Sequence, residues 1–327
     1  MDQANTLRRI VQHHKRQQER AQAAARPGPR PGSSTPRVIA ITSGKGGVGK
    51  TNTVLNLSLA LSRMQRRVLL LDADMGLANV DVLLGLTPRY TLEHVLAGQK
   101  DIGDVVLTGP FGLRILPSSS GISELSELEP EEQSRLFAEL RRIDEDVDYL
   151  FIDTGAGISS NVLRFNASAG EVYLVVSPEP TSMTDAYALM KLLSVKYQVH
   201  EFGLIANQVL SEQDGRAVYD RLHRVCSEYL HARLTYLGSV PFDRHIHRAV
   251  RQQRALMDLF PNAPAARSLA RIAAVVDQGG LRAPRAGSPS APPPAAPPPA
   301  GASASAPGAA HRPAAFWDRL LHWRKAK

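Results

Sequence analysis

The sequence predicts an α/β fold in which a mostly parallel, twisted sheet is flanked by helices on both faces, with flexible tails at its two ends. Short runs rich in Val, Ile and Leu recur through the middle of the chain and alternate with helical stretches. This pattern is typical of a parallel sheet buried on both faces. The hydrophobic share of 43% is enough for a sizeable core. The predicted strands span 38–42, 68–72, 113–116, 149–153, 172–177, 202–207 and 234–240.

Changes in composition predict five segments. In residues 1–25, apolar residues at helical spacing among basic ones predict an amphipathic helix. A Pro/Gly-rich linker over 26–36 separates it from the α/β domain, which we place at 37–279. Residues 280–315 are rich in Ala, Pro, Gly and Ser and predict a disordered tether, because this composition cannot bury a core. Aromatic, apolar and basic residues over 316–327 predict a second amphipathic helix.

Charge and cysteine content exclude several classes of function. The net charge of +8 lies in the tails and leaves the body between them mildly acidic, which disfavours a nucleic-acid surface and favours tail contacts with an acidic partner or anionic membrane. Only Cys226 is present, so a single chain supports no disulfide framework and no cysteine-ligated cluster. No stretch approaches 18 uninterrupted apolar residues, and the first residues lack a signal-peptide core. We therefore expect a cytoplasmic location.

The strongest motif is GKGGVGKT at 44–51, which fits a P-loop of the form G-x-x-x-x-G-K-[ST] and joins a predicted strand to a helical stretch. Its glycines allow backbone N–H groups to surround phosphate oxygens at the positive end of the helix. Lys50 is expected to reach the β- and γ-phosphates, and the Thr51 hydroxyl to ligate Mg²⁺. The predicted nucleotide-binding residues here are Gly44, Lys45, Gly46, Gly47, Val48, Gly49, Lys50, Thr51 and Asn52.

Carboxylates follow two of the predicted strands. Asp72 ends one strand with Asp74 two residues later, and Asp153 ends the strand YLFID. Ligands of parallel α/β sheets bind at the carboxyl ends of the strands. Asp153 has the Walker-B arrangement and can hold Mg²⁺ through water, and the glycine-rich turn after it can sense the γ-phosphate. For Asp72, a helix-capping or turn role is an alternative.

The early lysine of KGGVGKT, Lys45, makes this loop similar to the deviant Walker-A family that includes MinD and ParA. The resemblance implies slow ATP hydrolysis and an ATP-bound dimer in which Lys45 contacts the partner's nucleotide. It also implies that Asp74 positions the attacking water and that Asp72 lies close to the Mg²⁺ shell. A solvated loop lysine is the alternative for Lys45. Together the motifs predict the catalytic residues Asp74, Lys45 and Lys50 and the metal-binding residues Thr51, Asp72 and Asp153.

Three later residues resemble the adenine pocket of the same family. Asn207, at the end of FGLIAN, matches the asparagine that reads the base. Pro241 and Asp243, in SVPFD, match the loop that closes over it. A strand-end Asn or a turn Pro also occurs without a ligand. The run DTGAGI resembles the flagellar branch of the family, since other MinD proteins usually have proline in place of Gly155.

The opening DQANTLRR resembles the DQAxxLR motif of FlhG proteins (also called FleN or YlxH), which are MinD-like regulators of flagellar number and placement. In that family the N-terminal helix stimulates an FlhF-type signal-recognition GTPase. The segment 249–273 also resembles the C-terminal part of FlhG proteins. The matching partner-binding residues are Asp2, Gln3, Ala4, Leu7 and Arg8.

The final FWDRLLHWRKAK resembles the membrane-targeting helix of MinD and FlhG. Its aromatic residues suit the headgroup region and its basic residues suit anionic lipid. One such helix binds weakly, whereas two in a dimer gain avidity, so we expect peripheral binding to the inner face of the cell membrane in the ATP-bound state. Docking on a protein partner is the alternative. The predicted membrane-contacting residues are Phe316, Trp317, Leu320, Leu321 and Trp323.

These features predict an ATP-dependent, dimerising, membrane-associating ATPase that uses ATP and Mg²⁺ and controls flagella through an FlhF-type GTPase. The resemblance adds flagellar switch proteins or a flagellar transcription regulator as further partners. A ParA/MinD-type ATPase that positions another cargo, in chromosome or plasmid segregation or at the division site, is the alternative. Because the body is acidic, we do not expect direct DNA binding. A scaffold with a degenerate site is disfavoured because the motif lysines and carboxylates are intact.

Overall fold

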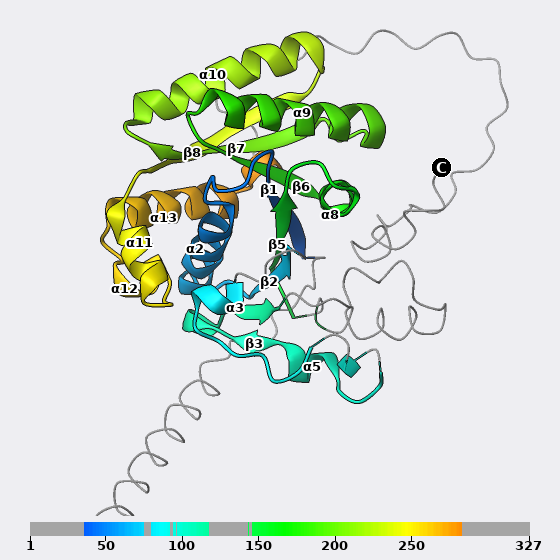
Figure 1. The fold of residues 1–327 in the computed structure, drawn as a ribbon, viewed down its shortest axis with the longest axis vertical. Coiled ribbons are helices and arrows are strands. Elements are labelled where there is room, and N and C mark those ends of the chain that lie inside the picture. The colour runs from blue at the N-terminus through cyan, green and yellow to red at the C-terminus, as the bar shows by residue number, and fades with distance from the viewer. Residues whose placement is uncertain are drawn as a thin grey trace, which may run out of the picture.

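The computed structural model describes residues 36–74, 80–91, 94–95, 97–117, 143 and 146–282. Within these residues, eight strands form one sheet in the order β3-β4-β2-β5-β1-β6-β7-β8, with helices on both faces (Figure 1). Neighbouring strands are parallel except for the pair β3 and β4 at one edge. The predicted α/β fold with a mostly parallel sheet is confirmed.

All seven predicted strands are present. Each apolar run forms a strand in which most side chains are buried in the sheet. The strand that the sequence did not predict is β3, whose two residues are too few for any periodicity to reveal. The strands are β1 (Arg37–Ser43), β2 (Val68–Ala73), β3 (Leu107–Thr108), β4 (Arg114–Leu116), β5 (Tyr149–Ala156), β6 (Glu171–Val176), β7 (Glu201–Val209) and β8 (Arg233–Pro241).

The helices begin where local chemistry favours it. Ser211 caps one helix by accepting a hydrogen bond from the N–H of Asp214, and Pro264 begins another, where no backbone donor is needed. The helices are α2 (Lys50–Arg63), α3 (Val80–Leu83), α5 (Ile102–Val105), α8 (Ser160–Ser168), α9 (Pro180–Tyr197), α10 (Glu212–Tyr229), α11 (Arg244–Arg251), α12 (Leu256–Leu259) and α13 (Pro264–Asp277), with 3-10 turns η1 (Pro110–Gly112) and η2 (Gly280–Arg282).

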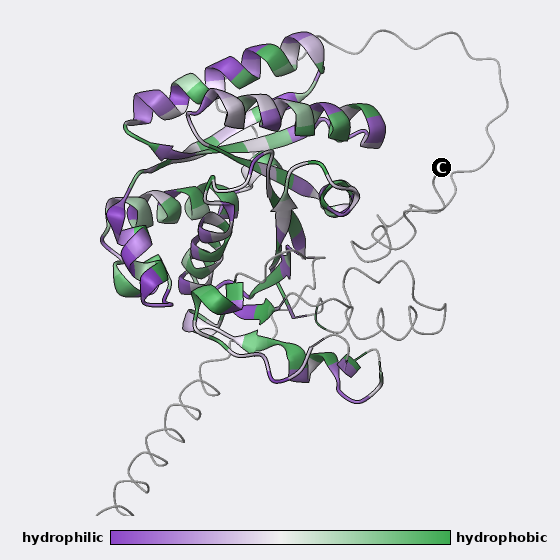
Figure 2. Cartoon of the chain, viewed as in Figure 1, coloured by the Kyte–Doolittle hydropathy of each residue, from purple (hydrophilic) through white to green (hydrophobic). Residues whose placement is uncertain are grey.

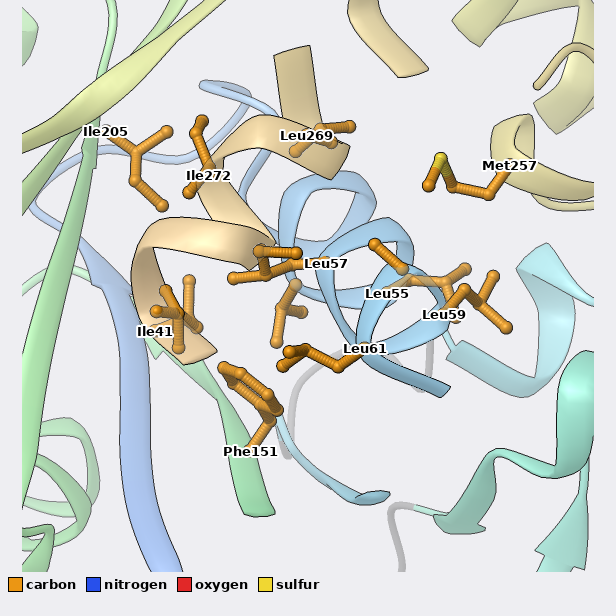
Figure 3. Close-up of a cluster of buried hydrophobic side chains, with 14 of the residues drawn as sticks. Ile41, Leu55, Leu57, Leu59, Leu61, Phe151, Ile205, Met257, Leu269 and Ile272 are labelled. Atoms are coloured by element: carbon orange, nitrogen blue, oxygen red, sulfur yellow. The ribbon is translucent and has the colours of Figure 1, made fainter. Parts of the chain in front are cut away.

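The strands place alternate side chains in cores on opposite faces of the sheet. Ile41 of β1 belongs to the core formed with α2 and α13, which Figure 3 shows together with Leu57 and Ile272. Leu174 of β6 belongs to the opposite core, formed with α9 and α10. Each large aliphatic side chain buried in this way stabilises the fold by about 2 kcal/mol. In Figure 2 hydrophobic residues follow the strands, and hydrophilic residues gather on the outer turns of α10 and α11.

The amino end of β1 is tied to the end of α13. The Arg37 guanidinium donates to the Glu171 carboxylate at 2.9 and 3.0 Å and to the carbonyl oxygens of Val276 and Gly279. Leu281 of η2 is buried in the same region, so core packing continues two residues past the predicted domain boundary at 279. These contacts lie at the amino end of β1, and the glycine-rich loop leaves from its opposite, carboxyl end (Figure 1).

None of the helices among the described residues has the length and apolarity to span a membrane. Several predicted segments fall outside the described residues. They are the helix over 1–25, the linker over 26–36 except its last residue, the tether over 280–315 beyond residue 282, and the helix over 316–327.

Candidate nucleotide-binding site

The glycine-rich loop lies at the carboxyl end of β1, and α2 begins directly after it at Lys50. Gly47 and Gly49 have φ values of 81° and 84°, a left-handed conformation that other residues adopt only with strain. Among the described residues, no side chain caps the first turn of α2, where Gly49 is the N-cap. The start of this helix can therefore offer backbone N–H groups and the positive end of its dipole to an anion.

The first glycine of the loop lies against α9. A Cβ atom at Gly44 would lie 2.2 Å from the carbonyl carbon of Asp185, well inside any contact distance. Because the obstacle is backbone within a helix, a side-chain movement cannot relieve it. The absence of a side chain at Gly44 therefore allows α9 to set where the loop begins.

Lys50 and Asp153 form a buried ion pair across the site. The Lys50 Nζ lies 2.6 Å from Asp153 Oδ1, and their side chains are 6% and 0% exposed. Complete burial raises the pKa of Asp153, and the Lys50 ammonium opposes that rise. In this structure the lysine predicted to bind phosphate is thus bound to the carboxylate of the predicted Walker-B strand. A phosphate group has to compete with Asp153 for it.

One oxygen of Asp153 has no hydrogen bond among the described residues, and such an oxygen could help to hold Mg²⁺. Its Oδ2 is buried and unpartnered, whereas its carboxylate also interacts with the Thr51 hydroxyl. Mg²⁺ in nucleotide sites is held by one or two protein oxygens together with phosphate oxygens and water. The described residues contain no group of three or more His, Cys, Asp or Glu placed as ligands. The donor set therefore fits an ion that arrives with a nucleotide; the metal roles of Thr51, Asp72 and Asp153 stay predictions.

Asp72 is fully buried at the end of β2 and is engaged by backbone groups. Its Oδ1 accepts a hydrogen bond from the N–H of Asp74 at 3.2 Å, and its Oδ2 accepts one from the N–H of Val80 at 3.3 Å. The second bond holds the first residue of α3 against the strand end. These contacts support the turn-stabilising alternative that the sequence left open for Asp72.

Asp74 lies between Lys50 and the glycine-rich turn after β5. Its Oδ2 is 4.0 Å from Lys50 Nζ, and a Cβ atom at Gly155 would lie 3.5 Å from its Oδ1. The side chain is one-quarter exposed, unlike that of Asp153. A carboxylate that lies beside Lys50 and is open to solvent can orient a water molecule or accept its proton. The catalytic role of Asp74 stays a prediction with this geometry behind it.

Lys45 is held within its own chain. Its Nζ donates to Glu179 Oε2 at 2.8 Å and to the Thr181 hydroxyl at 3.1 Å, at the start of α9. Both members of the ion pair are exposed, Lys45 by 41% and Glu179 by 59%, so the pair contributes at most about 1 kcal/mol. Lys45 can therefore leave this position at little energetic cost.

The residues predicted to contact the base have structural partners of their own. Asn207 is buried and its Nδ2 donates to the carbonyl oxygen of Val48 at 2.7 Å. Asp243 accepts hydrogen bonds from the N–H groups of His245 and Ala265, and so joins the first turns of α11 and α13. Burial raises the pKa of Asp243, but these bonds hold it below its ordinary value. Pro241 ends β8 beside a cavity of about 560 Å³ that borders α13.

The remaining predicted residues are placed as follows. Gly46 is exposed at the tip of the loop, and Asn52 is half-buried on α2. The predicted residues in 2–8 and in 316–323 lie outside the described residues. Sequence reasoning missed Glu179 and Gln208, which both contact the loop although neither belongs to a motif. Only the position of Gln208 directly after Asn207 could have drawn attention to it.

Comparison with known proteins finds relatives of this chain. The family model described as an AAA domain matches residues 36–202. The antiactivator FleN of Pseudomonas aeruginosa is 46% identical over 241 residues, covering 74% of this chain and 86% of FleN. The flagellum site-determining protein YlxH of Helicobacter pylori is 34% identical over 256 residues, covering 77% of this chain and 86% of YlxH.

A solved structure matches the same region. The septum site-determining protein MinD of Pyrococcus horikoshii, in complex with Mg-ADP, superimposes with a TM-score of 0.59 at 28% identity. The match covers 76% of this chain and 98% of the MinD chain.

Proposed function

Since this chain belongs to the MinD-like P-loop ATPases of the FleN and YlxH group, we propose that its ATP hydrolysis operates a switch that controls flagellar number and placement. ATP promotes a dimer, the dimer associates with the inner face of the membrane, and hydrolysis releases it. The observation that carries this proposal is the meeting of Lys50, Asp153 and Asp74 beside a glycine cradle.

The switch begins with Lys50. A bound nucleotide offers Lys50 a phosphate in place of Asp153, and this exchange frees the Asp153 carboxylate for Mg²⁺. Thr51, and Asp153 through water, would hold the ion, whose charge would offset that of the phosphates. Asp74 orients the attacking water from its position beside Lys50. The turn at Gly155 lies against Asp74, so a change at either one is transmitted to the other.

Dimerisation depends on the second lysine. Lys45 leaves Glu179 and reaches the nucleotide of a second copy, as the resemblance to MinD and ParA implies. The pair with Glu179 is exposed and weak, which makes this exchange inexpensive.

Three variants test this scheme by nucleotide binding, phosphate release and light scattering. Lys50→Ala should abolish ATP binding, Asp74→Asn should bind ATP but hydrolyse it at least tenfold more slowly, and Lys45→Ala should bind ATP but remain monomeric. Lys191→Ala, which changes an exposed lysine of α9, is the control. An Asp74→Asn protein with wild-type turnover would refute the assigned catalytic role.

The flagellar part of the proposal is tested with a peptide of residues 1–20. We expect it to stimulate the GTPase of a cognate FlhF-type protein, and we expect Gln3→Ala to remove the stimulation. Anionic vesicles test residues 316–327 in the same way: the full chain should bind in ATP, whereas Trp317→Glu should not. If a high excess of the peptide gives no stimulation, the flagellar role is refuted, and the alternative of a ParA/MinD-type ATPase that positions another cargo is favoured.

One observation favours the alternative in which the ATPase positions DNA. Arg244, Arg248 and Arg251 lie on one exposed side of α11, and none forms an ion pair with another described residue. A ParA-type ATPase would use such a surface on DNA, with an affinity that falls steeply with salt. Binding to duplex DNA that is lost in the Arg248→Glu variant would support this alternative over the flagellar one.

A further inference from the structure

We propose that Asn207 and Gln208 form a carboxamide clamp that holds the crest of the P-loop in its phosphate-binding shape. Both would be positioning residues for phosphate binding, separate from any contact that Asn207 makes with a base. The inference rests on the proposed phosphate-binding role of residues 44–51.

The clamp is built by an irregularity in β7. Asn207 pairs with Val240 of β8, but Val209 pairs with Pro241, so Gln208 is an extra residue in the ladder. Gln208 has a φ of 59°, a left-handed conformation that is costly for a residue with a side chain. In a regular strand, neighbouring side chains point to opposite faces. Here the bulge directs two consecutive side chains towards the same loop.

The two carboxamides contact consecutive carbonyl groups of the loop. Asn207 Nδ2 donates to the oxygen of Val48 at 2.7 Å, and Gln208 Nε2 donates to the oxygen of Gly47 at 3.4 Å. The closeness is confirmed at Gly49, where a Cβ atom would lie 2.4 Å from Asn207 Nδ2. The crest of the loop thus lies directly against the end of β7.

Holding these carbonyl groups in place also fixes the direction of the backbone N–H groups that follow them in the loop. The described residues have no cis peptide bond, and in a trans peptide the C=O of one residue points opposite to the N–H of the next. Holding the oxygens of Gly47 and Val48 towards β7 therefore turns the N–H groups of Val48 and Gly49 away from it. In a P-loop these are the groups that surround phosphate oxygens.

The two contacts differ in strength. Asn207 is buried and its bond is short, so its loss would leave the Val48 carbonyl without this donor in a buried place. Gln208 is exposed and its bond is long, so water can replace it at small cost. We expect Asn207 to carry most of the effect and Gln208 to refine it.

A ligand without a base separates this role from base recognition. Magnesium tripolyphosphate carries the phosphates of ATP but no adenine, so a residue that only reads the base does not influence its binding. We expect Asn207→Leu, which has a similar size and no charge but cannot donate to Val48, to weaken tripolyphosphate binding about tenfold in calorimetric titration of the full chain. Gln208→Ala should weaken it about two- to threefold.

Kinetics and stability give a second readout. Since the clamp shapes the loop equally before and during hydrolysis, these variants should raise KM for ATP and leave kcat within about twofold. Gln208→Gly should weaken tripolyphosphate binding as Gln208→Ala does, yet melt at a higher temperature than Gln208→Ala, because glycine relieves the left-handed backbone. Gln213→Ala, which changes an exposed glutamine on the first turn of α10, is the control.

The outcomes distinguish the clamp from the site on which it rests. Weaker ATP binding with unchanged tripolyphosphate binding in Asn207→Leu and Gln208→Ala would overturn the clamp and leave Asn207 as a base reader. Loss of tripolyphosphate binding in Lys50→Ala, without any effect of the clamp variants, would also overturn the clamp but keep the phosphate site. Unchanged binding in Lys50→Ala would overturn the phosphate site itself.

Discussion

The buried pair of Lys50 and Asp153 leads to a prediction about stability in the absence of nucleotide. Lys50→Met keeps the apolar stem but removes the ammonium, and so leaves a fully buried carboxylate without its cation. Removing one partner of a buried ion pair costs about 3–5 kcal/mol. We expect the lower end of that range, about 3 kcal/mol, because Asp153 can escape ionisation by binding a proton. For a domain of this size, the melting temperature should fall by roughly 6–12 °C.

The loss should depend on pH in a defined direction. Burial raises the pKa of Asp153, and removal of Lys50 raises it further. A carboxyl group with a raised pKa in the folded protein carries no penalty below the pKa of the unfolded chain, near 4. The penalty grows as the pH rises from there until the folded pKa is reached. The difference between Lys50→Met and the wild type should therefore be smaller at pH 5 than at pH 8.

Urea unfolding of the nucleotide-free protein, followed by circular dichroism, measures this. The double variant Lys50→Met with Asp153→Asn removes both charges and should regain most of the lost stability without regaining ATPase activity. Lys191→Met is the surface control and should change little. The reasoning fails if the double variant is no more stable than Lys50→Met, or if the loss is the same at both pH values.

Three further predictions concern contacts around the site and the opposite edge of the sheet. Gly44→Ala should weaken ATP binding at least tenfold in calorimetry, because its Cβ would meet the Asp185 backbone at 2.2 Å; wild-type affinity would contradict this close approach. Asp277→Asn should lower the unfolding free energy by about 1–2 kcal/mol at pH 7, because Asp277 accepts hydrogen bonds from Arg66 and Tyr149. The Arg66 bonds hold the pKa of Asp277 below its ordinary value. The difference in unfolding free energy between Asp277→Asn and the wild type should therefore be full above about pH 4 and vanish as the pH falls through the lowered pKa. A difference that persists in acid would refute this. Glu179→Ala should leave the melting temperature within about 2 °C, since its pair with Lys45 is exposed; a larger fall would make that pair structural.

The fold and the loop were predictable because their signals are local. Strands such as 38–42 are marked by continuous apolar runs, and GKGGVGKT places a turn between a strand and a helix. The antiparallel strand β3 was not predictable, because two residues of a sheet edge carry no periodic pattern.

The partners of the site residues were harder to predict because they depend on tertiary packing. No spacing indicates that Lys50 pairs with Asp153, which is 103 residues away. The bulge at Gln208 depends on the register between β7 and β8, and single-sequence patterns do not specify that register. Asp72 shows the reverse case, since the turn role weighed for it from the sequence is supported by its contacts.

The bonds of Arg37 to Val276 and Gly279 join segments from the two ends of the described body. These contacts anchor the first described strand to the end of the last long helix, and they lie at the amino end of β1. The length of β1, roughly 20 Å, then separates this anchor from the glycine-rich loop. A change at these contacts therefore acts at the end of the sheet remote from the glycine-rich loop, so it should alter the stability of the body and leave the shape of the loop unchanged.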